Sequence, residues 1–208
     1  MNGQVTAMIL AGGQSSRMGR DKALISIAGV PLLRSIYNIA AQCTPLVFVI
    51  TPWQERYRYI LPSQCKFIQE IIQESNISGE IKTHGPLLGF RQGLTLVETE
   101  WVLLLACDLP LLNFEVLADG IKQLNNVSDE IIAVLPRHSK GWEPLCGFYR
   151  RSCLPMLIDF INSGGRSFQQ WLRKYPVQEL ILLDKQVLFN CNTPDELASV
   201  GYNVIQSK

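Results

Sequence analysis

Two uninterrupted apolar runs constrain what this 208-residue chain can fold into. They are Leu46–Thr51 (LVFVIT) and Trp101–Cys107 (WVLLLAC), and neither alternates polar with apolar residues. A strand covered on both faces has this pattern, whereas a strand with one face in water alternates. The two runs therefore predict strands in the interior of a parallel sheet.

Other short runs predict the rest of the sheet. They are Ala7–Leu10, Lys66–Ile72, Ile131–Leu135, Cys146–Tyr149 and Leu180–Leu183. Helical patterns occupy Pro31–Cys43, Pro86–Val97 and Phe114–Leu124, and Thr193-Pro194 suits the start of a last helix. This alternation predicts an α/β fold with a single doubly wound, mainly parallel sheet and helices on both faces. No linker or repeat interrupts it, so residues 1–208 are expected to form one domain.

The bulk composition argues against several classes of protein. A net charge of +1 gives no argument for nucleic-acid or membrane-surface partners, so any anion site must be local. No apolar stretch reaches the ~18–20 residues of a membrane span, and the N-terminus lacks a signal-peptide pattern. The six cysteines contain no C-x-x-C pair and are expected to be reduced, buried thiols. These features predict a cytoplasmic protein.

A glycine-rich segment, AGGQSSRMGRDK, follows the first predicted strand at residues 11–22. Its spacing fits neither the Walker A pattern nor G-x-G-x-x-G. Successive glycine amides can still turn their N–H groups toward one anion, and Arg17 and Lys22 add two positive charges. Because ligands bind outside the carboxyl ends of parallel strands, we predict that this loop holds a triphosphate. A flexible surface turn with incidental charges is the alternative.

An aspartate, Asp108, directly follows the predicted strand Trp101–Cys107 and should lie on the same edge of the sheet as the loop. Mg²⁺ is often held by one or two carboxylates together with substrate phosphates. We therefore predict that Asp108 binds Mg²⁺. Capping of the next helix is the alternative, although Asn113 lies closer to that start.

With these residues in place, the chain resembles the molybdenum cofactor guanylyltransferases, a branch of the nucleotidyltransferases. The resemblance covers most of the chain and rests on L-A-G-G-x-S-x-R-M-G-x-D-K at residues 10–22, G-P-L-x-G at 85–89, C-D-x-P at 107–110, E-P-L-C-G-F-Y at 143–149 and F-N-x-N-T-P at 189–194. The first motif suggests nucleotidyltransferases in general. Its combination with the last motif indicates this branch.

The resemblance implies a Rossmann-like nucleotidyltransferase fold and a reaction that uses Mg²⁺. In that reaction GMP passes from GTP to the phosphate of molybdenum-molybdopterin, and pyrophosphate is released. GTP and molybdenum-molybdopterin are the implied substrates. Proteins that supply molybdopterin, and molybdoenzymes that receive the product, are the implied protein partners.

The resemblance also assigns residues by position. The nucleotide-binding residues are Leu10, Ala11, Gly12, Gly13, Lys22, Gly85 and Asp108. Those on the pterin side are Arg17, Arg166, Asn190 and Asn192. Arg17, Lys22 and Asp108 are expected to be catalytic, because aligning and neutralising anionic reactants is the main task. A solvated loop charge is the alternative for Arg166, and turn residues are the alternative for the two asparagines.

One departure from the family pattern leaves open which nucleotide base the protein recognises. Relatives usually carry an aspartate before G-P-L that reads guanine, but residues 66–85 contain no aspartate. They contain Glu70, Glu74 and Glu80, of which Glu74 or Glu80 could serve. A cytidylyltransferase or sugar-phosphate nucleotidyltransferase of the same group therefore stays open. A non-catalytic nucleotide-binding adaptor is a further alternative.

Overall fold

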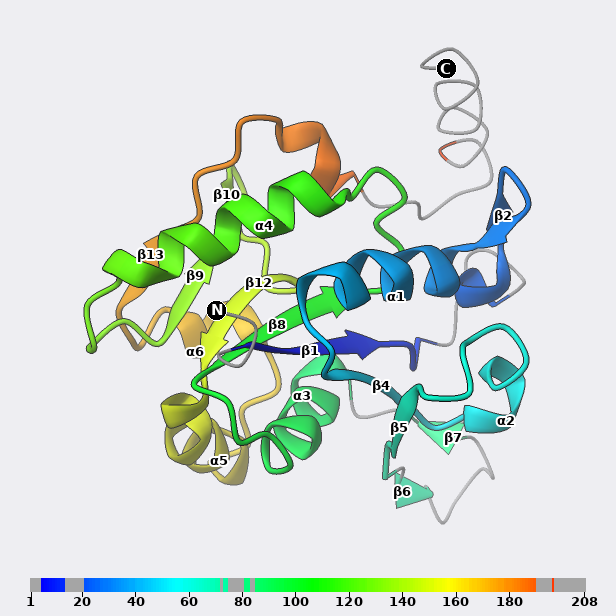
Figure 1. The fold of residues 1–208 in the computed structure, drawn as a ribbon. Helices are drawn as coiled ribbons and strands as arrows, with labels where there is room; N and C mark the ends of the chain where they lie inside the picture. Colours follow the sequence, from blue (N-terminus) through cyan, green and yellow to red (C-terminus); the bar gives the residue numbers. More distant parts are fainter. Residues whose placement is uncertain are drawn as a thin grey trace.

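A seven-stranded sheet runs through the centre of the computed structural model, which describes residues 5–13, 21–71, 73–74, 81–82, 85–189 and 196 (Figure 1). The strand order is β13-β9-β12-β8-β1-β4-β5. The strands are β1 (Val5–Leu10), β4 (Val47–Thr51), β5 (Lys66–Gln69), β8 (Trp101–Ala106), β9 (Ala133–Leu135), β12 (Cys146–Arg150) and β13 (Val177–Glu179). Only β12 runs antiparallel to its neighbours in this sheet. The prediction of a mainly parallel α/β sheet is confirmed.

Strands β1 and β8 form the middle of the sheet and pair in parallel. Their register runs from Val5 opposite Trp101 to Leu10 opposite Ala106. Every residue of β8 is buried, as the unbroken apolar run predicted. Both strands therefore end at the same edge, where the chain continues into Ala11 and Cys107.

Helices cover both faces of the sheet (Figure 1). The helices α1 (Leu32–Cys43) and α4 (Phe114–Gln123) lie on one face, and α3 (Pro86–Leu94), α5 (Leu154–Asn162) and α6 (Phe168–Leu172) lie on the other. Successive strand residues point to opposite faces, so Ala7 and Ile9 of β1 join the core beneath α1 while Met8 joins the core beside α3. None of the helices in the described parts of the chain is long and apolar enough to cross a membrane.

Several short elements complete the fold. They are α2 (Gln54–Tyr57), the 3₁₀ turns η1 (Lys22–Leu24), η2 (Leu124–Asn126), η3 (Arg151–Cys153) and η4 (Lys185–Leu188), and the two-stranded pairs β2–β3 (Ser26–Ile27 and Val30–Pro31), β6–β7 (Gln73–Glu74 and Ile81–Lys82) and β10–β11 (Arg137–His138 and Gly141–Trp142). Sequence patterns predicted α1, α3 and α4 but not α2, α5 or α6. The helix expected from Thr193 lies outside the described residues except for Glu196.

The predicted strand Leu180–Leu183 is wrong. The strand at this edge is β13, three residues earlier, and its ladder with β9 joins Val177 to Ala133 and Glu179 to Leu135. The N–H group of Leu180 still donates to the Leu135 carbonyl at 2.8 Å. Because β9 ends there, the following residues have no partner strand, and Leu183 is 96% exposed.

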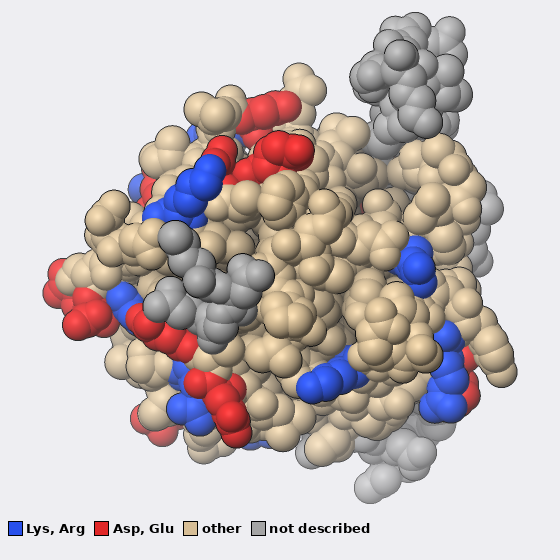
Figure 2. Space-filling model, in the orientation of Figure 1, with Lys and Arg blue, Asp and Glu red and all other residues tan. Residues whose placement is uncertain are grey.

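On the face shown in Figure 2, acidic and basic side chains lie close together at the left of the view, the centre is largely uncharged, and separate lysines or arginines lie toward the right. No large area of the described surface on this face carries one sign of charge. This distribution agrees with the net charge of +1. Any attraction of a charged ligand to the described part of this face must therefore come from a few neighbouring side chains.

A buried arginine, Arg150, secures the edge of the sheet opposite the ends of β1 and β8. Its side chain donates to the carbonyls of Ile131 at 3.1 Å and Val127 at 3.0 Å. It also pairs with Glu100, and its guanidinium lies 4.4 Å from the centre of the Trp101 ring. Buried carbonyls need donors, so this side chain holds the connection between α4 and β9 against β8.

Replacing Arg150 should therefore destabilise the fold. We expect Arg150→Met to lower the free energy of unfolding by about 3 kcal/mol, because buried carbonyls and a carboxylate lose their donor. Urea unfolding measures this change. Arg173→Met, at an exposed arginine, is the matched control and should change stability by less than about 0.5 kcal/mol. Equal effects of the two substitutions would contradict the anchoring role.

Candidate functional site

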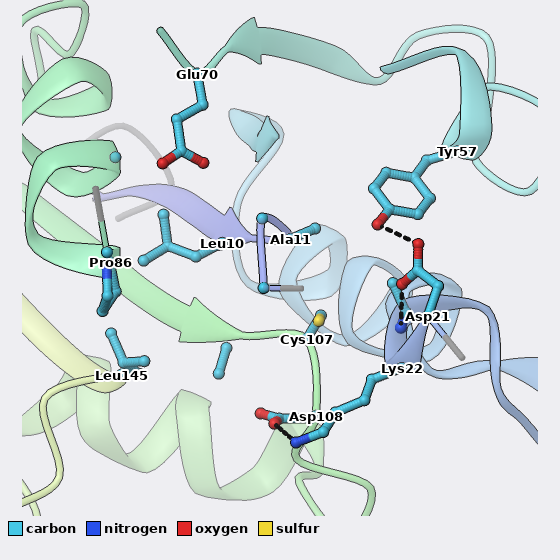
Figure 3. A pocket seen from close by; sticks show the side chains of 16 residues that line it. Leu10, Ala11, Asp21, Lys22, Tyr57, Glu70, Pro86, Cys107, Asp108 and Leu145 are labelled. Atoms are coloured by element: carbon cyan, nitrogen blue, oxygen red, sulfur yellow. Dashed lines mark hydrogen bonds and ion pairs between the residues drawn. The ribbon is translucent and has the colours of Figure 1, made fainter. Parts of the chain in front are cut away.

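A cavity of about 260 Å³ opens where β1 and β8 end (Figure 3). Its lining comprises Leu10, Ala11, Gly12, Gly13, Asp21, Lys22, Ala23, Tyr57, Glu70, Gly85, Pro86, Gly89, Ala106, Cys107, Asp108 and Leu145. Every residue that the motifs predicted to bind the nucleotide is among them. The structure thus brings together segments that are far apart in the sequence, at the edge expected for a ligand in a parallel sheet.

The first part of the glycine-rich loop is held by β4. The N–H group of Ala11 donates to the Ile50 carbonyl at 2.9 Å, and the Thr51 hydroxyl donates to the Ala11 carbonyl at 2.8 Å. Both backbone polar groups of Ala11 are therefore hydrogen-bonded to β4. The chain then passes Gly12 and Gly13, which both line the cavity.

An ion pair joins the two charged residues that the sequence placed at this edge. The Lys22 ammonium lies 3.1 Å from Oδ2 of Asp108, and each side chain is 16% exposed. Lys22 begins η1, while Asp108 follows the end of β8. Asn113 caps α4 by accepting from the Val116 N–H at 3.0 Å, so Asp108 is not the cap of this helix.

Helix α3 directs its N-terminus at the cavity. Gly85 and Pro86 both line the cavity, and Gly85 has φ of +84°, a conformation that a residue with a β-carbon adopts only with strain. The first turn of a helix has N–H groups without intrahelical partners and a partial positive charge. This end of α3 can therefore attract an anionic or electron-rich part of a ligand.

Glu70 is a cavity residue for which the sequence analysis assigned no role. It follows β5 and is 7% exposed, and a β-carbon added at Gly12 would lie 2.4 Å from its Oε2 atom. Any larger residue at position 12 would therefore require the Glu70 carboxylate to move. Burial raises the pKa of Glu70 from 4.5 to about 7. The sequence signal was the absence of aspartate in this segment, but it did not single out Glu70.

Two further lining residues, Asp21 and Tyr57, were also missed. The Tyr57 hydroxyl donates to Oδ2 of Asp21 at 2.8 Å, and the Ala23 N–H donates to Oδ1 at 3.0 Å. Tyr57 lies in α2, whose four residues are too short to produce a clear helical pattern in the sequence. Asp21 directly precedes Lys22 in the glycine-rich segment, yet nothing in the sequence indicated that it pairs with Tyr57.

The residues assigned to the pterin side are not gathered at the cavity by the described structure. Arg166 is exposed, and its guanidinium donates to the carbonyls of Ile161 at 2.9 Å and Gly165 at 2.7 Å, at the end of α5. Arg17, Asn190 and Asn192 lie outside the described residues. Glu80 does too, and of Glu74 only the backbone, in β6, is described.

The chemistry of the cavity fits a divalent cation that arrives with phosphates. In the described parts of the chain, no three His, Cys, Asp or Glu residues form a group that could hold a metal ion. Asp108 is a carboxylate that lines the cavity just after the end of β8. Mg²⁺ commonly uses one or two protein carboxylates and takes its other ligands from phosphates and water, so Asp108 meets this requirement.

Comparison with known proteins agrees with this geometry. Residues 7–179 match the model of the MobA-like NTP transferase domain. A probable molybdenum cofactor guanylyltransferase of Nostoc sp. is 57% identical over 196 residues, which are 94% of this chain and 90% of the relative. The molybdenum cofactor guanylyltransferase of Pseudomonas entomophila is 34% identical over 193 residues, 91% of this chain and 94% of the relative.

Solved structures show the same fold. The molybdopterin-guanine dinucleotide biosynthesis protein A of Archaeoglobus fulgidus superposes with a TM-score of 0.74 at 22% identity, covering 97% of this chain and 99% of that one. A protein of Aquifex aeolicus superposes with a TM-score of 0.70 at 23% identity, covering 90% and 93%. The protein is therefore a nucleotidyltransferase, and its chain belongs to the molybdenum cofactor guanylyltransferase family.

Proposed function

We propose that this protein, with Mg²⁺, transfers GMP from GTP to the phosphate of molybdenum-molybdopterin and releases pyrophosphate. The observation that carries the proposal is the juxtaposition of the Gly12–Gly13 backbone, Lys22 and Asp108 around one cavity. This set supplies the amides, the cation and the carboxylate that a magnesium-bound triphosphate requires. The family relationship supports the choice of substrates.

The proposed chemistry joins two anions. A phosphate oxygen of the pterin substrate attacks the α-phosphorus of GTP, a new P–O bond forms, and the bond from that phosphorus to pyrophosphate breaks. The attacking phosphate is already ionised near neutral pH, so the step needs no general base. Lys22 would bind the phosphates and offset the charge that develops on the leaving pyrophosphate.

Asp108 would hold Mg²⁺ next to Lys22. When bound, the metal supplies Lewis-acid charge neutralisation on the phosphate oxygens. The ion pair of Lys22 with Asp108 keeps both charged groups at the cavity. With substrate present, Lys22 would turn to phosphate, and Asp108 would exchange an ammonium for a metal ion.

We also propose that Glu70, rather than Glu74 or Glu80, reads the base. Glu70 lies on the opposite side of the cavity from the Lys22–Asp108 pair, with Leu10 and Ala11 between them (Figure 3). A nucleotide that places its phosphates at Lys22 would therefore extend its base toward Glu70. An ionised carboxylate accepts from the ring N–H and the amino group of guanine, a donor pair that cytosine lacks.

A cytoplasmic location belongs to the same proposal. Its support is that Cys43, Cys65, Cys107, Cys146 and Cys153 are free thiols. Burial raises the pKa of Cys43 and Cys65 to about 11 and that of Cys146 and Cys153 to about 12, so these groups stay protonated. Free thiols persist in a reducing compartment.

The reaction itself is directly testable. Purified protein with GTP, Mg²⁺ and molybdenum-molybdopterin should form the guanine dinucleotide and pyrophosphate, and CTP should be a poor substitute. Product analysis and a pyrophosphate assay measure both quantities. Equal or better use of CTP would overturn the base assignment, and no product above a protein-free reaction would overturn the proposal.

Asp108→Asn should reduce turnover by about 100-fold, because a neutral amide is a much weaker ligand for Mg²⁺. The rate of pyrophosphate release at saturating GTP is the measurement. The matched control is Asp119→Asn in α4, where the side chain is 49% exposed and Asp119 pairs only with Lys122 among the described residues. Normal turnover in a folded Asp108→Asn protein would remove this residue from the metal site.

Glu70 should make stability depend on pH. Its pKa is higher in the folded protein than the ordinary 4.5, so the folded state binds more protons between pH 4.5 and about 7, and the contribution of Glu70 to stability falls as pH rises through this range. The variant Glu70→Gln cannot ionise at this position, so it lacks this loss of stability at higher pH. The melting temperature of the variant relative to the wild type should therefore be higher at pH 8 than at pH 5. A difference in melting temperature that does not change with pH would contradict the raised pKa of Glu70.

The same carboxyl group should control GTP affinity. Only the ionised form accepts at both oxygens, because protonation turns one oxygen into a donor, so GTP binding to the wild type should weaken by up to about tenfold for each pH unit below 7. Calorimetric titration at pH 6 and pH 8 measures this effect. Glu70→Gln is the control for ionisation of the phosphates, and it should bind GTP weakly with a smaller pH dependence. Matching pH profiles would exclude Glu70 as the base reader.

A further inference from the structure

We propose that Tyr57 is a positioning residue for nucleotide binding, which acts on Lys22 by holding the Asp21 carboxylate away from the phosphates. This inference rests on the proposed role of Lys22 as a triphosphate ligand. It assigns a function to a residue of α2 that no motif indicated. The geometry points to it through the two hydrogen bonds that occupy Asp21.

The carboxylate of Asp21 is occupied at both oxygens. Oδ1 accepts from the Ala23 N–H at 3.0 Å and thereby caps η1, the turn that begins with Lys22. Oδ2 accepts from the Tyr57 hydroxyl at 2.8 Å, and an Arg56 Nη1 atom lies 3.9 Å away. Among the described residues, the Tyr57 hydroxyl is therefore the side-chain donor nearest to the Asp21 carboxylate. Because Asp21 caps the turn that begins with Lys22, the position of Asp21 also fixes the position of the Lys22 backbone.

The position of Asp21 makes this restraint important. Asp21, Lys22 and Asp108 all line the cavity, and the Asp21 side chain is only 16% exposed (Figure 3). A second carboxylate facing the same space would repel a triphosphate and compete with it for the Lys22 ammonium. Tyr57 directs Oδ2 toward α2 and leaves Lys22 oriented toward Asp108.

Tyr57 is well suited to act as a fixed donor. Its side chain is 1% exposed, so the ring cannot turn away without disturbing the core. Burial, together with the hydrogen bond to Asp21, raises the pKa of the Tyr57 phenol well above its ordinary value. The hydroxyl therefore keeps its proton over the working pH range and donates throughout.

Tyr57→Phe tests the proposal, because it removes the hydroxyl and keeps the buried ring. We expect the dissociation constant of GTP with Mg²⁺, measured by calorimetry without the pterin substrate, to rise about tenfold, as is typical when a hydrogen bond to a charged group is lost. Tyr37→Phe is the matched control at another buried tyrosine, 6% exposed in α1, and should bind GTP like the wild type.

A double-mutant cycle with Lys22→Ala separates positioning from general loosening of the fold. If Tyr57 acts through Lys22, Tyr57→Phe should weaken GTP binding in the wild-type background but by less than about twofold when Lys22 is already alanine. Thermal unfolding of each variant establishes that the measured protein is folded.

Each other outcome has a distinct meaning. Full GTP affinity in Tyr57→Phe, while Lys22→Ala binds weakly, would overturn this inference and leave the proposed function intact. Equal, additive losses from Tyr57→Phe in both backgrounds would also overturn it, because the hydroxyl would then act independently of Lys22. Full GTP affinity in Lys22→Ala would overturn the proposed role of Lys22 and this inference with it.

Discussion

The parallel pairing of β1 with β8 is the constraint on which the site depends. The register places Leu10 opposite Ala106, so both strands end at one edge and release Ala11 and Cys107 side by side. A shift of this register along the strands would move the loop away from Asp108. The two strands also supply side chains to both cores, so the packing that maintains the register stabilises the sheet as a whole.

The cavity has two chemically different sides. Lys22 and Asp108 form a charged side near the loop, while Glu70 forms a buried side against Gly12 and α3. The burial that raises the pKa of Glu70 comes from the same close packing that brings the loop to it. A buried carboxyl group is destabilising unless it is hydrogen-bonded, so a ligand that supplies matching donors would stabilise it.

Much of this architecture was predictable because strong local patterns determine it. Unbroken apolar runs identified β4 and β8, and apolar residues at helical spacing identified α1 and α4. The prediction of Leu180–Leu183 as a strand failed because an apolar run shows burial or strand propensity, whereas a strand also needs a partner. Here β9 ends at Leu135, and the edge strand had to form at Val177–Glu179.

The sequence by itself determined the alternation of strands and helices, the loop after the first strand, and the edge at which Lys22 and Asp108 meet. These follow from local periodicity and from the rule that parallel strands end together. Only the tertiary structure decided that Glu70 lines the cavity, that Tyr57 holds Asp21, and that Arg166 turns to the end of α5. Each of these depends on where side chains from distant segments come to lie, and that is set by packing between layers rather than by spacing along the chain.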